Sequence, residues 1–168
     1  PPDAVINSGS VMVYFGTGDR TNPLETGVVD RFYAVRDDGS DNLGEAALVD
    51  VTNNVTQPGT AAEATLLQQI ANQKGWYIRL QGDGEKVLAP PTVFFNVAFT
   101  TFTPSGAACA AGGDARIYAM NPLQGAPTLD LAGTSGAALG DGSAGGSGSG
   151  GDLVAGDRWV LVGQSIPT

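Results

Sequence analysis

The chain has 168 residues, of which 42% are hydrophobic and 15% charged, enough for one folded domain with a core. Its net charge of −9 and the lack of any cluster of Lys and Arg exclude the basic surface that nucleic-acid binding requires. Histidine is absent, which argues against zinc, haem and Ser-His-Asp chemistry. No apolar run reaches the roughly 18 residues that a membrane span needs. We expect an acidic protein with no membrane span that is not an enzyme.

Short apolar runs between turn residues predict β-strands along most of the chain. The many glycines, 25 in all, suit the tight turns that such strands require. Most runs are apolar at both alternating positions, which is typical of strands covered on both faces, as in stacked sheets or propeller blades. The fold class expected is therefore all-β. The predicted strands cover residues 11–15, 31–35, 76–80, 93–103, 116–120 and 159–162.

One helix is predicted within this β-rich sequence. Thr60 and Glu63 form a capping-box pattern, and the apolar residues that follow share one helical face. Gly75 suits a helix terminator, so we expect a short inserted helix near residues 61–73. The same insertion contains a short extra strand at residues 49–51. Farther along, Asp-Gly within residues 81–85 predicts a hairpin turn.

The chain is interpreted as a single segment over residues 1–168, with one flexible part. Residues 133–152 are rich in Gly, Ser and Ala, which indicates a flexible loop. The chain begins with Pro1-Pro2 and carries no initiator Met or signal peptide. Residues 165–168 read as the lead into another strand. We expect a processed or internal part of a longer protein.

Asp38, Ser40 and Asn42 are the candidate metal ligands. They alternate within a polar turn and could present oxygen atoms to calcium. The sixth position of an EF-hand-type loop needs Gly, whereas this turn has Leu43. A solvated turn is the alternative interpretation. Nothing in the sequence singles out catalytic residues or a pair of carboxylates for acid–base chemistry.

Two further features each allow two interpretations. Trp76, Tyr77 and Trp159 could stack on a sugar ring, or they could pack between sheets, as aromatic residues in cores do. The single cysteine, Cys109, cannot form an internal disulfide. It is either a small buried or loop residue, or it pairs with a cysteine outside this chain.

The strand motifs, taken in order, are similar to the C-terminal β-propeller of PilY/PilC proteins, which are tip-associated adhesins and assembly factors of type IV pili. The similarity runs from about Val11 to Thr168. Two departures are the absence of a second cysteine and the Asp19-Arg20-Thr21 segment after the first motif. The matching segments are VYFGTG at 13–18, FYAV at 32–35, GWYIRL at 75–80, EKVLAPP at 85–91, FTTFTPS at 99–105, and Cys109 with IYAMN at 117–121.

This resemblance implies about two antiparallel blades of a partial propeller at the bacterial cell surface, on the pilus tip or the outer membrane. The partners it implies are pilus subunits or minor pilins, a host or abiotic surface, and the remaining blades of the parent protein. The family's calcium loop has no convincing copy in this segment. We therefore expect no cofactor here, and calcium belongs elsewhere in the full-length protein.

The leading functional hypothesis is an adhesin or a type IV pilus biogenesis factor that acts by protein or surface binding. A quinoprotein-like propeller enzyme is one alternative, and it predicts a bound quinone and calcium. A structural subunit or decoration of an extracellular filament is another, because unpaired sheet edges accept strands from neighbours.

Overall fold

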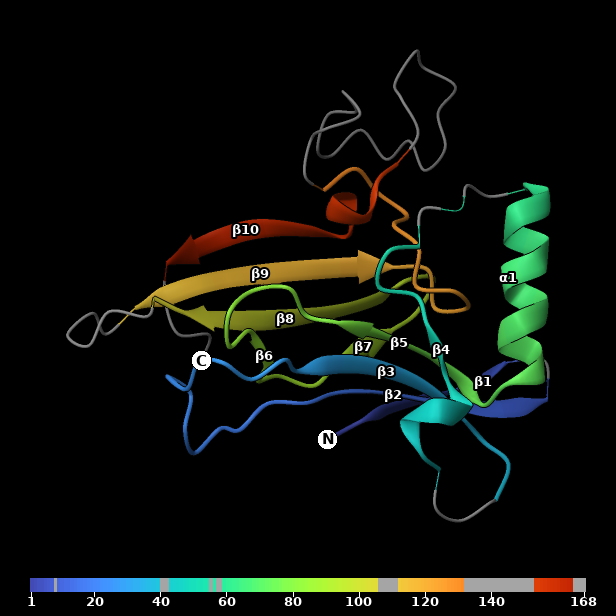
Figure 1. Cartoon of the computed structure of the whole chain (residues 1–168), viewed down its shortest axis with the longest axis horizontal. Helices are drawn as coiled ribbons and strands as arrows, with labels where there is room; N and C mark the ends of the chain where they lie inside the picture. The colour runs from blue at the N-terminus through green and yellow to red at the C-terminus, as the bar shows by residue number, and fades with distance from the viewer. Residues whose placement is uncertain are drawn as a thin grey trace.

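The computed structural model describes residues 1–7, 9–39, 43–54, 56, 59–105, 112–131 and 153–164. Within these ranges the chain is mostly strand (Figure 1). The strands are β1 (Asp3–Asn7), β2 (Ser10–Gly16), β3 (Arg31–Asp37), β4 (Val49–Asp50), β5 (Gly75–Arg79), β6 (Lys86–Val87), β7 (Thr92–Val93), β8 (Val97–Pro104), β9 (Gly113–Met120) and β10 (Trp159–Gln164). The helices are α1 (Ala61–Asn72) and two 3-10 turns, η1 (Glu45–Ala47) and η2 (Ala155–Arg158).

The strands form two sheets that follow one another along the chain. Sheet A has the order β1-β2-β3-β5-β4, and sheet B has the order β10-β9-β8-β6. Four strands of each sheet are antiparallel neighbours in chain order, so each sheet contains a four-stranded meander. Strand β4 pairs with β5 in parallel. Strand β7 pairs with residues 97–98 of β8, whereas β6 pairs with residues 101–102 of the same strand. The all-β prediction is confirmed, although the described strands form no closed barrel or propeller.

The core lies between the two sheets. Because side chains alternate along a strand, one face of each sheet supplies the buried aromatic residues. Phe32 of sheet A stacks on Phe99 of sheet B, with ring centroids 3.9 Å apart and planes inclined by 2°. Phe99 in turn stacks on Tyr118 at 4.8 Å. Trp76 is fully buried in the same cluster, so aromatic contacts join the sheets.

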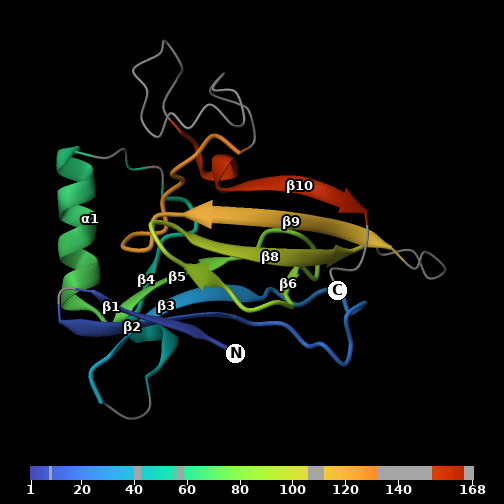
Figure 2. The ribbon, with the colours of Figure 1, turned by 180° about the vertical axis from the view of Figure 1, so that it is seen from behind.

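The predicted helix forms, and Figures 1 and 2 show it at one end of the two sheets. The Thr60 hydroxyl accepts the Glu63 backbone N–H at 3.2 Å, and the Glu63 carboxylate accepts the N–H of Gly59 at 2.6 Å. Gly75, however, does not end the helix, because Gln73 is its C-cap. Gly75 starts β5 at φ +133°, where a Cβ atom would collide with the Ala34 carbonyl of β3.

The turn after β5 differs from its prediction. An Asp-Gly hairpin would pair β5 with β6, but β5 belongs to sheet A and β6 to sheet B. The turn therefore carries the chain across from one sheet to the other. Gly84 adopts φ +66°, and the Asp83 carboxylate accepts the Gly27 N–H at 2.9 Å. The extra strand predicted at residues 49–51 is confirmed as β4.

The long strand predicted over residues 93–103 is interrupted. Strands β7 and β8 form a hairpin, and residues 94–96 make its tip. The Phe94 N–H donates to the Asn96 carbonyl at 2.9 Å, which closes the turn. The loop predicted at residues 133–152 and the chain end at residues 165–168 lie outside the described residues.

Candidate functional site

A buried carboxylate, Glu85, organises the polar interior of sheet B. Its Oε1 atom accepts hydrogen bonds from the Thr101 hydroxyl at 2.6 Å and the Tyr118 hydroxyl at 2.9 Å. Its Oε2 atom accepts the Gly82 N–H at 2.8 Å and Arg116 Nη1 at 2.7 Å. Glu85 has no exposed surface. A buried charge is tolerated when it is paired and hydrogen-bonded in this way.

The donors around Glu85 are themselves held in place. The Arg116 guanidinium lies 4.1 Å from the centre of the Trp159 ring, a cation–π contact. Burial, followed by the nearby Glu85 charge, raises the pKa of Tyr118, which keeps its phenol protonated as a donor. Since both oxygens of Glu85 are hydrogen-bonded and buried, the cluster links the chain just before β6 to β8 and β9.

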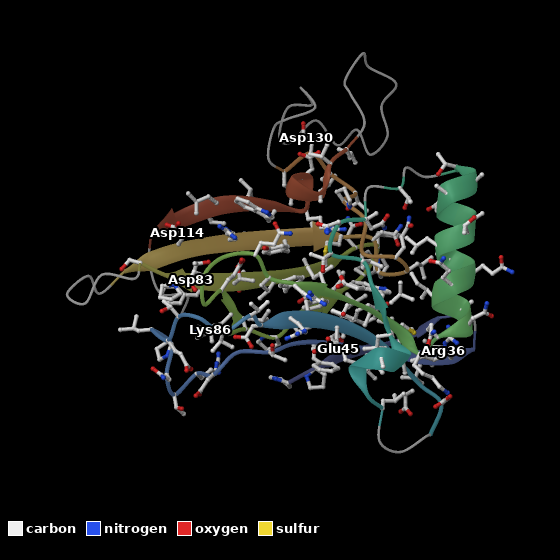
Figure 3. All side chains as sticks on the ribbon, in the orientation of Figure 1. Arg36, Glu45, Asp83, Lys86, Asp114 and Asp130 are labelled. Atoms are coloured by element: carbon white, nitrogen blue, oxygen red, sulfur yellow. The ribbon has the colours of Figure 1, made fainter. Side chains whose placement is uncertain are left out.

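Lys86 is a second buried charge, and backbone carbonyls hold it. Its Nζ atom donates to the Glu25 carbonyl at 2.5 Å and the Gly84 carbonyl at 2.8 Å. In Figure 3, Lys86 and Asp83 lie at the same end of the sheets. Both residues contact the loop between β2 and β3, so this end of the molecule is fixed by side chains from the crossing turn.

Arg158 repeats this arrangement at the start of β10. Its guanidinium donates to the carbonyls of Val51 and Asn54 at 2.8 Å and also to that of Thr52. Burial lowers the pKa of Arg158 to about 10. The contact ties the last strand of sheet B to the segment that follows β4 of sheet A.

The calcium candidate is only partly within the described residues. Asp38 forms an ion pair with Lys74, whereas Ser40 and Asn42 lie outside the described ranges, as does Cys109. Among the residues that are described, no group of three or more acidic or cysteine side chains is placed to hold a metal ion. The calcium interpretation of Asp38, Ser40 and Asn42 stays a prediction.

The three aromatic candidates occupy different places. Trp76 is fully buried, and its indole N–H donates to the Pro122 carbonyl at 3.1 Å, so it presents no ring face to a sugar. Trp159 packs against the core and carries Arg116 on its face. Tyr77 lies on the opposite face of β5 from Trp76, within a separate aromatic row.

That row crosses the outer face of sheet A. Phe15, Tyr33 and Tyr77 come from β2, β3 and β5. The ring centroids of Phe15 and Tyr33 are 5.1 Å apart, and those of Tyr33 and Tyr77 are 5.8 Å apart. The Tyr33 hydroxyl donates to Glu45 at 2.9 Å, and Figure 3 shows Glu45 on the segment beside sheet A. Burial, followed by this hydrogen bond, raises the pKa of Tyr33 to about 12. The Arg79 guanidinium lies 5.9 Å from the centre of the Tyr77 ring, so a cation borders the row.

An apolar groove adjoins the row. Its volume is about 490 Å³, and Arg20 is the one charged residue in its lining. We call it the apolar groove throughout. It is lined by Pro1, Pro2, Val13, Phe15, Gly16, Gly18, Arg20, Val87, Leu88, Ala89, Pro90 and Pro91.

The tip of the β7–β8 hairpin, residues 94–96, follows the groove-lining Pro91 closely in sequence. Phe94 and Phe95 are 82% and 83% exposed, and their rings meet edge to face at 4.5 Å. We call this pair the aromatic tip. The apolar groove and the aromatic tip are thus apolar surface features, whereas the aromatic row is half-buried at Phe15 and Tyr33 and buried at Tyr77.

No family model, curated protein or solved structure matches the chain. Within the described residues, no helix has the length and apolar character needed to cross a membrane.

Sequence reasoning missed the groove, the tip and the buried charges. One signal was available for the first two, because residues 87–113 contain no charged side chain. No comparable signal marked Glu85 or Lys86, which follow an Asp-Gly turn and carry the residue types of an exposed loop. Their burial depends on strands that are distant in the chain.

Proposed function

We propose that this chain is part of the β-propeller of a bacterial surface protein similar to the PilY/PilC pilus-tip proteins, acting in adhesion and pilus assembly through protein contacts. One observation carries the proposal. Sheets A and B are consecutive four-stranded antiparallel meanders that pack face to face. Neighbouring blades of a propeller have this organisation.

The segments that resemble the family support this interpretation, because each has a strand of these meanders. VYFGTG includes the end of β2, FYAV lies in β3, and GWYIRL covers β5. EKVLAPP contains β6, while FTTFTPS and IYAMN fall on β8 and β9.

The Gly-Thr-Gly motif has a packing role that fits such a pair of blades. A Cβ atom on Gly16 would collide with the Val87 side chain, and one on Gly18 would lie 2.8 Å from Cβ of Lys86. The Val87 N–H also donates to the Thr17 carbonyl at 2.9 Å. Glycine therefore lets the end of β2 approach the first strand of the next sheet closely.

The proposed partners are pilus subunits or minor pilins, a host or abiotic surface, and further blades of the parent protein. The aromatic row supports protein binding, since its half-buried members Phe15 and Tyr33 and the bordering Arg79 are residue types enriched at interfaces, although Tyr77 is buried. Localisation at the pilus tip or outer membrane and calcium binding elsewhere in the full-length protein belong to the same proposal.

Direct binding tests it. The chain is immobilised, and purified pilus subunits and minor pilins from the same bacterium are passed over it. We expect saturable binding that weakens when Tyr33→Ala removes the centre of the aromatic row. Tyr33→Phe keeps the ring and serves as the control. The absence of binding to every subunit, together with the absence of the parent protein from sheared pilus fractions, would overturn the proposal.

A further inference from the structure

We propose that two copies of this chain associate by placing the aromatic tip of each in the apolar groove of the other. The inference concerns self-association and does not rest on the pilus proposal. It begins from the most exposed large apolar side chains that the structure describes, Phe94 and Phe95, together with Ile6 at 81%.

The aromatic tip is exposed and yet held in shape. Strand β7 pairs with β8 on either side of it, and the Phe94 N–H to Asn96 carbonyl bond fixes the turn. The Val93 N–H donates to the Asp3 carboxylate at 2.8 Å, which anchors the hairpin to β1. Because the two rings already contact each other, little conformational freedom is lost when a partner covers them. Single exposed apolar residues are ordinary, but two adjacent Phe rings in solvent mark an interaction site.

The apolar groove has the size and chemistry to receive such a pair. Its volume of about 490 Å³ lies within the roughly 300–1,000 Å³ range of protein ligand pockets. Four prolines supply rigid walls, and Phe15 offers a ring for aromatic contact. The tip does not fill the groove of its own chain, since both of its rings are exposed.

Charge favours this contact over others on the molecule. Two chains of net charge −9 repel each other, and like charges brought together oppose association. Residues 87–113, which include the tip and one wall of the groove, are free of charge. The charged residue in the groove lining is the cation Arg20. Neither the tip nor the groove lining carries a carboxylate, and the neighbouring Asp3 carboxylate is engaged by the Val93 N–H.

The area and the connectivity fit a reciprocal pair. An exposed Phe offers about 150–200 Å² for burial, so four rings and the groove walls that cover them give roughly 1,200–1,600 Å². This is the size of a specific protein interface, about 1,200–2,000 Å². Pro91 lines the groove and Phe94 begins the tip only three residues later. Because the tip and the groove are adjacent on each copy, two copies can exchange tips in a closed two-fold pair.

The test is sedimentation of the whole 168-residue chain over a range of concentrations, with circular dichroism to check folding. We expect a monomer–dimer equilibrium that strengthens with added salt, because salt screens the repulsion between acidic chains. Phe94→Ser with Phe95→Ser should raise the dissociation constant at least about tenfold. Pro90→Glu, on the exposed groove wall, should do the same from the other side of the contact.

Leu161→Ser with Val162→Ser is the matched control, because these β10 residues are 51% and 57% exposed and lie outside tip and groove. This pair of changes should leave the dimer intact. A chain that stays monomeric at every concentration, or a tip variant that associates like the original, would overturn the proposal. Open-ended oligomers would contradict the two-fold arrangement. A monomer that co-sediments with phosphatidylcholine vesicles through the tip would assign the tip to a lipid surface instead.

Discussion

Glu85 illustrates how a buried charge is stabilised by donors from several strands. Its carboxylate collects four hydrogen bonds from β8, β9 and the preceding turn, and one of the donors is a cation. Removing one member of a buried pair costs more than the pair contributes, because the other charge stays behind without compensation. The cluster therefore makes sheet B sensitive to a single-atom change at Glu85.

Glu85→Gln is predicted to destabilise the chain by about 3 kcal/mol, since it leaves Arg116 without its carboxylate. The free energy of unfolding in urea, followed by tryptophan fluorescence, measures the change. Glu45→Gln is the matched control, because Glu45 pairs with Arg31 at 2.9 Å but is partly exposed. That surface pair is expected to contribute at most about 1 kcal/mol. Equal effects of the two substitutions would contradict the role assigned to Glu85.

Tyr14 makes stability depend on alkaline pH. Burial raises its pKa from 10.0 to about 12, so the folded state holds a proton that the unfolded state releases. This stabilisation is complete below pH 10 and is lost as the pH rises to 12. Between pH 10 and pH 12, the unfolding free energy of the original chain should fall by about 2–3 kcal/mol more than that of Tyr14→Phe.

Two features of the structure make Tyr14→Phe a suitable comparison with the original chain. The Pro122 carbonyl that accepts the Tyr14 hydroxyl also accepts the Trp76 indole N–H, so Tyr14→Phe leaves no unpaired acceptor. Arg158, whose pKa is lowered to about 10, acts in the opposite sense over the same interval, but it does so equally in both proteins. Parallel pH profiles of unfolding free energy for the two proteins would refute the assignment.

At the scale of elements, local signals predicted what local forces determine. The helix depends on the cap formed by Thr60 and Glu63, two residues three positions apart, and it formed as predicted. Strands β2, β3, β5, β8, β9 and β10 were predicted from their apolar runs, whereas β1 and β6 were not predicted. The Asp-Gly hairpin was predicted wrongly, and the predicted 93–103 strand is confirmed only with an interruption at residues 94–96, because pairing with β8 decides both and lies outside any local window.

Gly75 links β5 to β3 and provides an element-scale prediction. Gly75→Ala should destabilise by about 3 kcal/mol, because the new Cβ meets both an unfavourable φ of +133° and the Ala34 carbonyl. Gly27 also has a positive φ, +78°, but open space around it, so Gly27→Ala should cost about 1–2 kcal/mol. Urea midpoints in the reverse order would show that close approach of β3 does not determine the choice of glycine.

At the scale of the whole molecule, two meanders in sequence, joined by aromatic contacts, form the basis of the functional proposal. The sequence predicted a strand-rich fold of stacked sheets but not the surfaces on which the proposed binding depends. Phe15, Tyr33 and Tyr77 lie 18 and 44 positions apart in the chain, and only the register of β2, β3 and β5 aligns them. The groove likewise joins the first two residues to residues 87–91.

The most direct test of the functional account is electron microscopy of the source cells with gold-labelled antibodies raised against this chain. The account predicts gold at the tips of pili, and loss of that label in a strain that lacks the gene. Label confined to the cell interior, or distributed without relation to pili, would contradict it.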